Sequence, residues 1–360
     1  MTKAEVVDGV EQLRSEILRI CSRLLESTDL TVDDDFFDKG GDSLLATELM
    51  LELRQLTGKA LPDSLLFESS TVRSLAQRLS EKESPQPKMA VRVGAVSDDA
   101  MPVLFFHGDW TRGGFYVEHL ARKLGSGISL IAVAPHGPGG EPIPPTIEAM
   151  AADRLAAVLE AQPAGPYRLA GHCLGGIVAF ETARLLKNLN HQVETVIMID
   201  SPVLVGGEVQ VAPKGEWRDL DPTSEDIPVR PLTPEFDWGL EPYSERLAAY
   251  SPTPLSVRLL VIAGELDGRG WARQSDDATL QETHTGHFDL VTIRIDELAG
   301  RMRSWLTGDE SFDGSEPRAF PSAGKDEPTR VGSSNEETPP LAVGETKEKS
   351  LSHRLRRFLN

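Results

Sequence analysis

The stretch Leu169-Ala170-Gly171-His172-Cys173-Leu174-Gly175-Gly176 has the form glycine, any residue, nucleophile, any residue, glycine. The apolar run 167–170 precedes the motif that starts at Gly171, and an apolar helical pattern follows the motif as far as Ala183. Glycines on both sides let the backbone and the helix approach each other closely at a strained turn. The stretch therefore predicts a strand, a sharp turn and a helix, with Cys173 presented at the turn as a nucleophile.

Cysteine stands at position 173, where this pattern leads one to expect serine. Sulfur leaves the geometry of the turn as it is but changes the chemistry, because a thiolate forms far more readily at neutral pH than an alkoxide. A strand, nucleophile turn and helix are the context in which an α/β-hydrolase exposes its nucleophile. The competing interpretation is that Cys173 is a buried thiol of the core.

Apolar strands alternate with helical patterns from residue 101 to 307, which predicts an α/β fold with a mostly parallel sheet and helices on both faces. We expect strands at 103–106, 130–134, 167–170, 193–199 and 257–263, and helices at 115–124, 146–161, 173–188 and 288–306. The segment 201–242 breaks this rhythm, since it is rich in proline, glycine and acidic residues. We interpret it as an insertion that forms a lid over the site.

The flanking segments differ in composition from this α/β region. Residues 1–82 show apolar residues at helical spacing and predict a small helical bundle, and 83–100 is a proline-containing linker. Residues 308–360 are expected to form a disordered tail, because 308–345 is polar, acidic and rich in proline and serine. Residues 351–360 have the pattern of a short basic helix.

Charge and cysteine content exclude several classes of function. The 360-residue chain has a net charge of −19, which argues against nucleic acid or an anionic membrane as partner. No apolar run is long enough to span a membrane, and the N-terminus lacks the apolar core of a signal peptide. The two cysteines, Cys21 and Cys173, fall in different predicted modules, so we expect no disulfide and a cytoplasmic location.

An acyl-transfer site needs a base for the nucleophile and an acid that orients the base. In α/β-hydrolases these follow the nucleophile in the order acid, histidine. Asp200, directly after the strand 193–199, is the candidate acid, and His287, just before the last helix, is the candidate base. Asp267, after the next predicted strand, is the alternative acid, and His284 is the alternative base.

The site also needs backbone donors for the developing oxyanion. We expect one from the amide of Leu174, which follows the nucleophile, and one from the loop after the strand 103–106. In that loop Asp109 is the first choice and Gly108 the second. His107 and His172 are interpreted as structural residues that hold the loop backbone beside the site. No metal site is predicted.

Residues 101–307 resemble the thioesterase domain that terminates nonribosomal peptide synthetases. The matching stretches are Phe106-His107-Gly108, Gln162 to Tyr167, Gly171 to Gly176, and Phe180 to Arg184. The resemblance implies a catalytic triad of Cys173, His287 and Asp200, with the acid at Asp200 rather than Asp267. The family usually has serine in place of Cys173, and this departure leaves hydrolysis, acyl transfer and cyclisation open.

Residues 36–45, Phe-Phe-Asp-Lys-Gly-Gly-Asp-Ser-Leu-Leu, closely resemble the phosphopantetheine site of peptidyl carrier proteins. The resemblance implies a four-helix carrier domain in which Ser43 bears 4′-phosphopantetheine. The ordinary interpretation of Ser43 is an N-cap of the following helix. Lys39 replaces the apolar residue common in the family, which affects partner docking but leaves Ser43 in place. Cys21, on an apolar stripe, is expected in the core.

Together these patterns predict a carrier–thioesterase didomain that releases an acyl or peptidyl chain in nonribosomal peptide or hybrid polyketide biosynthesis. The partners so implied are a phosphopantetheinyl transferase and adenylation, condensation or other synthetase proteins acting in trans. Three alternatives remain. In the first, the enzyme passes the acyl or peptidyl group to an amine or a hydroxyl. In the second, the hydrolase half is inert and the protein serves only as a carrier and docking protein. In the third, the protein is an unrelated cysteine hydrolase of small lactones.

Overall fold

The computed structural model describes residues 3–94, 100–108, 113–137, 141–205, 208–210, 229–231, 241–283, 285–309 and 318–319. The chain divides into two compact units, Met1–Ala323 and Gly324–Asn360. All described residues belong to the first unit. Within it we distinguish a helical domain, residues 3–80, and an α/β domain, residues 90–309.

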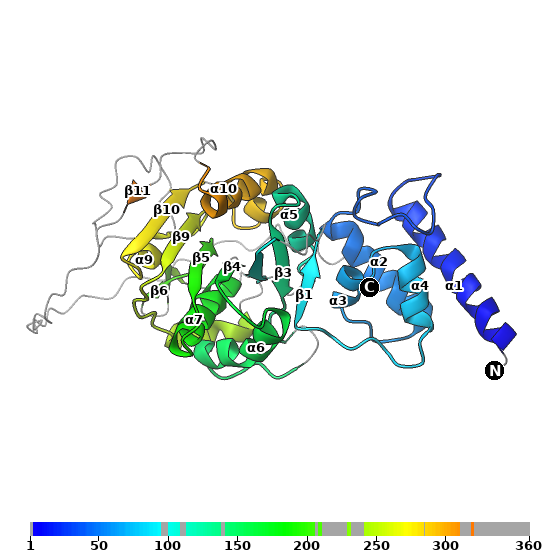
Figure 1. Cartoon of the computed structure of the whole chain (residues 1–360), viewed down its shortest axis with the longest axis horizontal. Coiled ribbons are helices and arrows are strands. Elements are labelled where there is room, and N and C mark those ends of the chain that lie inside the picture. Colours follow the sequence, from blue (N-terminus) through cyan, green and yellow to red (C-terminus); the bar gives the residue numbers. More distant parts are fainter. Residues whose placement is uncertain are drawn as a thin grey trace, which may run out of the picture. The chain divides into compact units, whose positions relative to one another are not determined.

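The helical domain consists of α1 (Lys3–Leu24), α2 (Ser43–Thr57), α3 (Ser64–Glu68) and α4 (Val72–Ser80) (Figure 1). Its core is built from one apolar stripe on each helix, among them Ile17, Leu49, Leu65 and Leu75. Cys21 lies in this core, as predicted. Burial and the nearby Glu52 carboxylate raise the pKa of its thiol to about 12.

The start of α2 is fixed by Asp42, whose Oδ1 accepts hydrogen bonds from the amides of Leu44 and Leu45, both at 2.9 Å. Asp42 is therefore the N-cap and Ser43 is the first residue of the helix, so the N-cap interpretation of Ser43 is wrong. An aspartate side chain at this position satisfies two amides that the helix itself leaves unpaired. Ser43 is left half-buried, with its hydroxyl free of the capping task.

The main sheet of the α/β domain has eight strands in the order β1-β3-β2-β4-β5-β9-β10-β11. The central pairs from β3 to β10 are parallel, whereas β1 on β3 and β11 on β10 are antiparallel. The strands are β1 (Ala90–Val93), β2 (Pro102–Phe106), β3 (Ser129–Val133), β4 (Tyr167–His172), β5 (Val193–Ile199), β9 (Arg258–Ala263), β10 (Asp277–Glu282) and β11 (Arg318–Ala319).

Helices cover both faces of this sheet. The helices α6 (Ile147–Ala161) and α7 (Leu174–Asn188) pack on one face, and α5 (Tyr116–Leu124) and α10 (Ile295–Thr307) pack on the other (Figure 1). Each face has its own apolar core, because the buried strands alternate their side chains between the two sides. The predicted α/β-hydrolase fold with a preceding helical bundle is confirmed.

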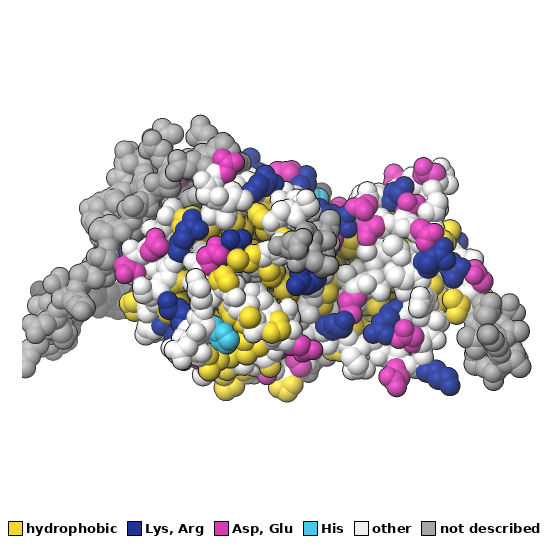
Figure 2. All heavy atoms as spheres, in the orientation of Figure 1, with side chains coloured by type: hydrophobic (Ala, Val, Ile, Leu, Met, Phe, Trp, Pro, Cys, Tyr) yellow, Lys and Arg dark blue, Asp and Glu magenta, His cyan; other side chains and the backbone are white. Residues whose placement is uncertain are grey.

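Four shorter helices complete the described part of the α/β domain. These are η3 (Glu241–Tyr243), α8 (Ser244–Ala249), α9 (Arg269–Ala272) and η4 (Asp289–Val291). None of the helices among the described residues is long and apolar enough to cross a membrane. On the face shown in Figure 2, acidic and basic side chains are interspersed over both domains.

Two predicted segments need correction, and one strand of the sheet was not predicted. The segment 83–100 is more than a linker, because Ala90–Val93 pairs with β3 as strand β1. The helix expected at 288–306 is divided into η4 and α10 by residues 292–294, where the β-branched Thr292 and Ile293 follow the β-branched Val291 at the end of η4. Consecutive β-branched residues disfavour the α-helix, which explains the break. Strand β10 was not predicted, because its sequence Asp-Ala-Thr-Leu-Gln-Glu is too polar to form an apolar run.

Only parts of the predicted lid and tail fall within the described residues. In the lid segment 201–242, three short strands form an antiparallel sheet, namely β6 (Leu204–Val205), β7 (Glu208–Gln210) and β8 (Val229–Pro231). In the tail, Arg318–Ala319 pairs with β10, so the prediction of disorder is wrong for these two residues. The remainder of both segments, including the basic pattern at 351–360, lies outside the described residues.

Glycine allows α7 to start directly against β2. A Cβ atom added to Gly175 meets the carbonyl oxygen of Phe106 at 2.0 Å, and one added to Gly171 meets the backbone of Gly175 at 2.4 Å. Both distances are shorter than any side chain tolerates, so the turn between β4 and α7 needs these glycines.

We predict that Gly175→Ala lowers the free energy of unfolding by about 2–4 kcal/mol, because the backbone of β2 has to move to admit the methyl group. Urea denaturation measures the effect. Gly127→Ala is the matched control, because nothing lies within 4 Å of a Cβ at that position, and we expect it to change stability by less than about 0.5 kcal/mol. Equal midpoints for the two variants would contradict the prediction.

Candidate active site

Cys173 occupies a strained turn between β4 and α7. Its backbone has φ 56° and ψ −131°, a conformation that residues with a side chain rarely adopt. The amide of Cys173 donates to the carbonyl of Ile199 on β5 at 2.9 Å, which holds the turn at the carboxyl edge of the sheet. The side chain is 1% exposed. Backbone strain of this kind is retained at functional sites, where surrounding contacts enforce it.

Asp200 follows the neighbouring strand β5 and is held by the loop after β9. Its Oδ1 accepts hydrogen bonds from the amides of Gly264 (2.7 Å) and Leu266 (2.9 Å). Its Oδ2 lies 2.7 Å from Nδ1 of His287. Because Oδ1 is occupied by two fixed donors, the carboxylate is locked with Oδ2 facing the imidazole.

His287 lies in the loop between β10 and η4 and is 1% exposed. Its amide donates to a carboxylate oxygen of Glu265 at 3.1 Å. The loop after β9 therefore holds both Asp200 and His287 in place. Its Nδ1 faces Asp200, and the Cys173 side chain interacts electrostatically with the same imidazole. The structure therefore brings Cys173, His287 and Asp200 into one connected set.

The charge state of His287 follows from this set. Burial opposes the imidazolium, but the charge of Cys173 and the hydrogen bonds to Asp200 and Cys173 outweigh it and raise the pKa of His287 to about 10. The imidazole is thus arranged to stay protonated at neutral pH. A carboxylate behind a histidine and a thiol in front of it is the arrangement that nucleophilic acyl transfer requires.

His172 supports His287 from the side. The two rings are 4.5 Å apart between centroids with a tilt of 33°, and Nε2 of His172 lies 3.2 Å from the carbonyl oxygen of His287. Because a carbonyl only accepts, His172 donates through Nε2. Burial and the charge of His287 hold the pKa of His172 well below its usual range. A neutral His172 is compatible with a positive charge on its neighbour.

The alternative acid, Asp267, has a different partner. It is fully buried and forms a forked ion pair with Arg269, with the shortest contact 2.7 Å from Nη2 to Oδ2. The Arg269 guanidinium binds both carboxylate oxygens of Asp267. The carboxylate in contact with His287 is that of Asp200. The alternative base, His284, lies outside the described residues.

Of the expected oxyanion donors, Leu174 opens α7, and the amides at a helix start have no partner within the helix. Asp109, the first choice for the second donor, lies outside the described residues. Gly108, the second choice, lies against the turn at Cys173, since a Cβ added to it meets Cβ of Cys173 at 3.0 Å. A small cavity beside the turn is lined by Gly108, Leu174 and Gly175.

Sequence patterns gave no sign of the groups that hold Asp200 and His287 in place. The amides of Gly264 and Leu266 and the carboxylate of Glu265 lie in a loop without a motif. The one sequence feature that could have indicated these groups is that they directly follow strand β9 and precede Asp267, which places them in a loop at the carboxyl edge of the sheet.

Comparisons with known proteins identify both domains. Residues 11–79 match the family model described as the phosphopantetheine attachment site, and residues 105–217 match that of the thioesterase domain. The chain therefore contains a segment that matches a phosphopantetheine carrier domain and a segment that matches a thioesterase domain. A domain of the first kind carries 4′-phosphopantetheine covalently, after modification by a phosphopantetheinyl transferase.

Two relatives are similar to about half of this chain. Indigoidine synthase of Streptomyces lavendulae is 36% identical over 191 residues, which is 52% of this chain and 15% of that protein. A dimodular nonribosomal peptide synthase of Bacillus subtilis (strain 168) is 36% identical over 176 residues, which is 47% of this chain and 7% of that protein. The chain thus spans a small fraction of these relatives' length.

Among solved structures, the NocB thioesterase domain from the nocardicin cluster shares 22% identity with a TM-score of 0.46, over 61% of this chain and 99% of that one. Holo-AB3403, a four-domain nonribosomal peptide synthetase, shares 22% identity with a TM-score of 0.48, over 82% of this chain and 26% of that one.

We predict that Cys173→Ala lowers the pKa of His287 from about 10 toward its ordinary value near 6.5, because the largest contribution that raises it is removed. Titration of the imidazole ¹⁵N shifts by NMR measures this pKa. Cys21→Ala is the matched control, since Cys21 lies in the core of the helical domain. An unchanged His287 titration in Cys173→Ala would show that the thiol is not its charge partner.

Proposed function

We propose that the chain releases an acyl or peptidyl group, held as a thioester on its own Ser43, through a triad of Cys173, His287 and Asp200. The observation that carries this proposal is the contact of 2.7 Å between Asp200 and His287, whose imidazole also interacts electrostatically with Cys173 at the N-cap of α7. The biosynthetic context is that of nonribosomal peptide or hybrid polyketide assembly. Adenylation, condensation or other synthetase enzymes would supply the cargo.

The residues around Ser43 fit the prosthetic group. Ser43 is half-buried at the first position of a 15-residue helix, where the helix dipole favours the negative charge of a phosphodiester. Asp42 already caps the helix, so modification of Ser43 removes no structural hydrogen bond of its side chain. The group supplies a thiol that holds the cargo as a thioester on a long arm.

In the first step the Cys173 thiolate attacks the thioester carbonyl carbon. A carbon–sulfur bond forms to Cys173, and the amides of Leu174 and Gly108 or Asp109 donate to the carbonyl oxygen as it becomes negative. His287, protonated at Nε2, gives that proton to the departing sulfur as the original carbon–sulfur bond breaks. Asp200 keeps the imidazole oriented and stabilises its positive charge before transfer.

In the second step His287, now neutral, takes the proton from the incoming acceptor while the acceptor attacks the acyl-enzyme. The Cys173 thiolate leaves, and the starting charge state is restored. Water as the acceptor gives hydrolysis. An amine or a hydroxyl gives acyl transfer or cyclisation.

Sulfur at position 173 favours the transfer outcome as a second candidate. Exchange between two thioesters is close to balanced, whereas a serine enzyme would convert the thioester into a more stable oxoester. Cys173 therefore preserves the activation of the acyl group for its acceptor. Product analysis with water alone and with added amines or alcohols separates hydrolysis from transfer.

We predict that Cys173→Ala reduces release from Ser43 by at least about 1,000-fold, because the nucleophile is lost. Loading of Ser43 with an acyl-phosphopantetheine should persist. Intact-mass spectrometry of the chain, modified with acyl-coenzyme A and a phosphopantetheinyl transferase, measures both. Wild-type protein should also show an acyl adduct on the Cys173 peptide.

Two controls complete this experiment. Ser43→Ala should acquire no phosphopantetheine, and Cys21→Ala should still release its cargo. Continued release by Cys173→Ala would refute the assignment of the nucleophile. Absence of a phosphopantetheine adduct on wild type would instead favour a hydrolase of small free substrates.

We predict that Asp200→Asn slows release by roughly 10³-fold, because the amide no longer fixes and charges the imidazole. Asp267→Asn is the matched comparison. It breaks the buried pair with Arg269 and should mainly lower stability, by about 3–5 kcal/mol. Single-turnover rates and thermal unfolding distinguish the two effects, and a larger rate loss in Asp267→Asn would reverse the assignment of the acid.

A further inference from the structure

A phenylalanine of the α/β domain lies in the core of the helical domain. Phe115, immediately before α5, is 1% exposed and belongs to the apolar core formed by α1 to α4. Its ring lies 5.2 Å from that of Phe67 and 6.5 Å from that of Phe37, measured between centroids. Contact of this depth resembles packing within a domain more than a transient surface contact.

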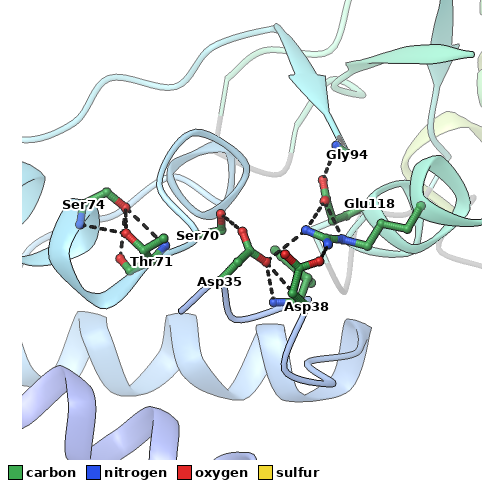
Figure 3. Close-up of polar contacts among 9 residues, drawn as sticks. Asp35, Asp38, Ser70, Thr71, Ser74, Gly94 and Glu118 are labelled. Atoms are coloured by element: carbon green, nitrogen blue, oxygen red, sulfur yellow. Dashed lines mark hydrogen bonds and ion pairs between the residues drawn. The ribbon is translucent and has the colours of Figure 1, made fainter. Parts of the chain in front are cut away.

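An arginine two turns along α5 binds the same side of the helical domain. Arg122 contacts Asp35 at 2.9 Å and also Asp38, and its guanidinium lies 5.7 Å from the ring centre of Phe37. Figure 3 shows Asp35, Asp38 and Glu118 gathered at this point between the two domains. Glu118, on α5 itself, accepts from Arg122 at 2.9 Å and from the amide of Gly94 at 2.8 Å.

The loop that Arg122 binds is held by hydrogen bonds of its own. Asp35 accepts from the amides of Phe37 and Asp38 at 2.9 and 3.0 Å, and its other oxygen accepts from the hydroxyl of Ser70. Five residues after Asp38 the same loop reaches Ser43. Because Arg122 of α5 binds Asp35 and Asp38, the position of Ser43 relative to α5 is restricted.

Charge complementarity supports a specific contact. Burial, with a smaller contribution from Asp35, raises the pKa of Glu118 to about 7. The Arg122 guanidinium forms ion pairs with three carboxylates, namely Asp35 and Asp38 of the helical domain and Glu118 of α5. Removing Arg122 leaves acidic groups facing each other across the junction, which opposes association.

We propose that Phe115 and Arg122 form a docking surface through which the α/β domain recognises a carrier by the loop that leads to its modified serine. This inference rests on the proposed function, since it names the partner that delivers the cargo. The surface fits a carrier with acidic residues at both positions equivalent to Asp35 and Asp38 and an aromatic ring between them. Carriers lacking these groups would be poor donors to Cys173.

Arg122→Glu in the full phosphopantetheinylated chain tests the proposal. Two rates of Cys173 acylation are compared, one from the acyl group on Ser43 and one from a small free thioester such as an acyl N-acetylcysteamine. We expect the ratio of the first to the second to fall at least about tenfold. Arg78→Glu is the control, because Arg78 pairs with Glu81 at the end of its own helix, and its ratio should equal that of wild type.

A second readout does not depend on catalysis. ¹⁵N relaxation of amides in α1, α2 and α4 reports whether the helical domain tumbles with the α/β domain or by itself. We expect a shorter correlation time for these amides in Arg122→Glu than in wild type. Equal correlation times together with an unchanged ratio of rates would overturn the proposal.

Two further variants guard against misfolding. Phe115→Ala should give the same fall in the ratio through loss of the apolar contact. The exchange Arg122→Asp with Asp38→Arg should restore part of the ratio, since Asp38 is the more exposed of the two carboxylates that the helical domain presents to Arg122. Thermal unfolding shows whether the variants are folded. If they are folded and the exchange does not restore the ratio of rates, this result counts against the pairing of Arg122 with Asp38. If free thioester fails to acylate wild-type Cys173, the proposed function fails while the relaxation data still test docking.

Discussion

Asp200 is the group on which the geometry of the candidate active site depends. Its carboxylate joins three separate parts of the α/β domain, namely the end of β5, the loop after β9, and the loop that carries His287. Its own backbone is held at φ 43°, and its amide donates to Ile262 on β9 at 2.7 Å. Because each oxygen has a fixed donor, the imidazole has one favourable orientation, with its second nitrogen toward the turn at Cys173.

The buried histidine pair shows how charge is distributed around this group. His172 and His287 are in ring contact, yet their pKa values are shifted in opposite directions. The difference arises from their partners, since His287 faces a carboxylate and a thiol whereas His172 faces a backbone carbonyl. Two adjacent imidazoles with separated pKa values allow one to hold a proton while the other remains a neutral support.

Much of this arrangement was predictable from the sequence because it depends on local patterns. The glycines around Cys173, the buried parallel strands and the apolar stripes of the bundle each leave a periodic or spacing signal. Asp200 and His287 were nominated as candidates because chain order and strand ends restrict the choice. The contact between them, and the pairing of Asp267 with Arg269, depend on loop conformation, for which short-range patterns carry no information.

The parts that could not be predicted are short, polar or dependent on distant partners. Strand β10 is polar because it lies toward the edge of the sheet, and β1 is only four residues long. The role of Phe115 depends on a core to which it contributes from outside the helical domain. An isolated aromatic residue before a helix has no signature that distinguishes such a contact from packing within its own domain.

Strand β1 has a practical consequence for dividing the protein. It pairs with β3 over Ala90–Val93 and so covers one margin of the sheet. A fragment that starts at residue 101 would leave the backbone groups of β3 open to solvent, and an open strand of this kind recruits other chains and promotes aggregation. Expression of the α/β domain by itself should therefore begin upstream of Ala90, so that the first strand travels with the sheet it protects.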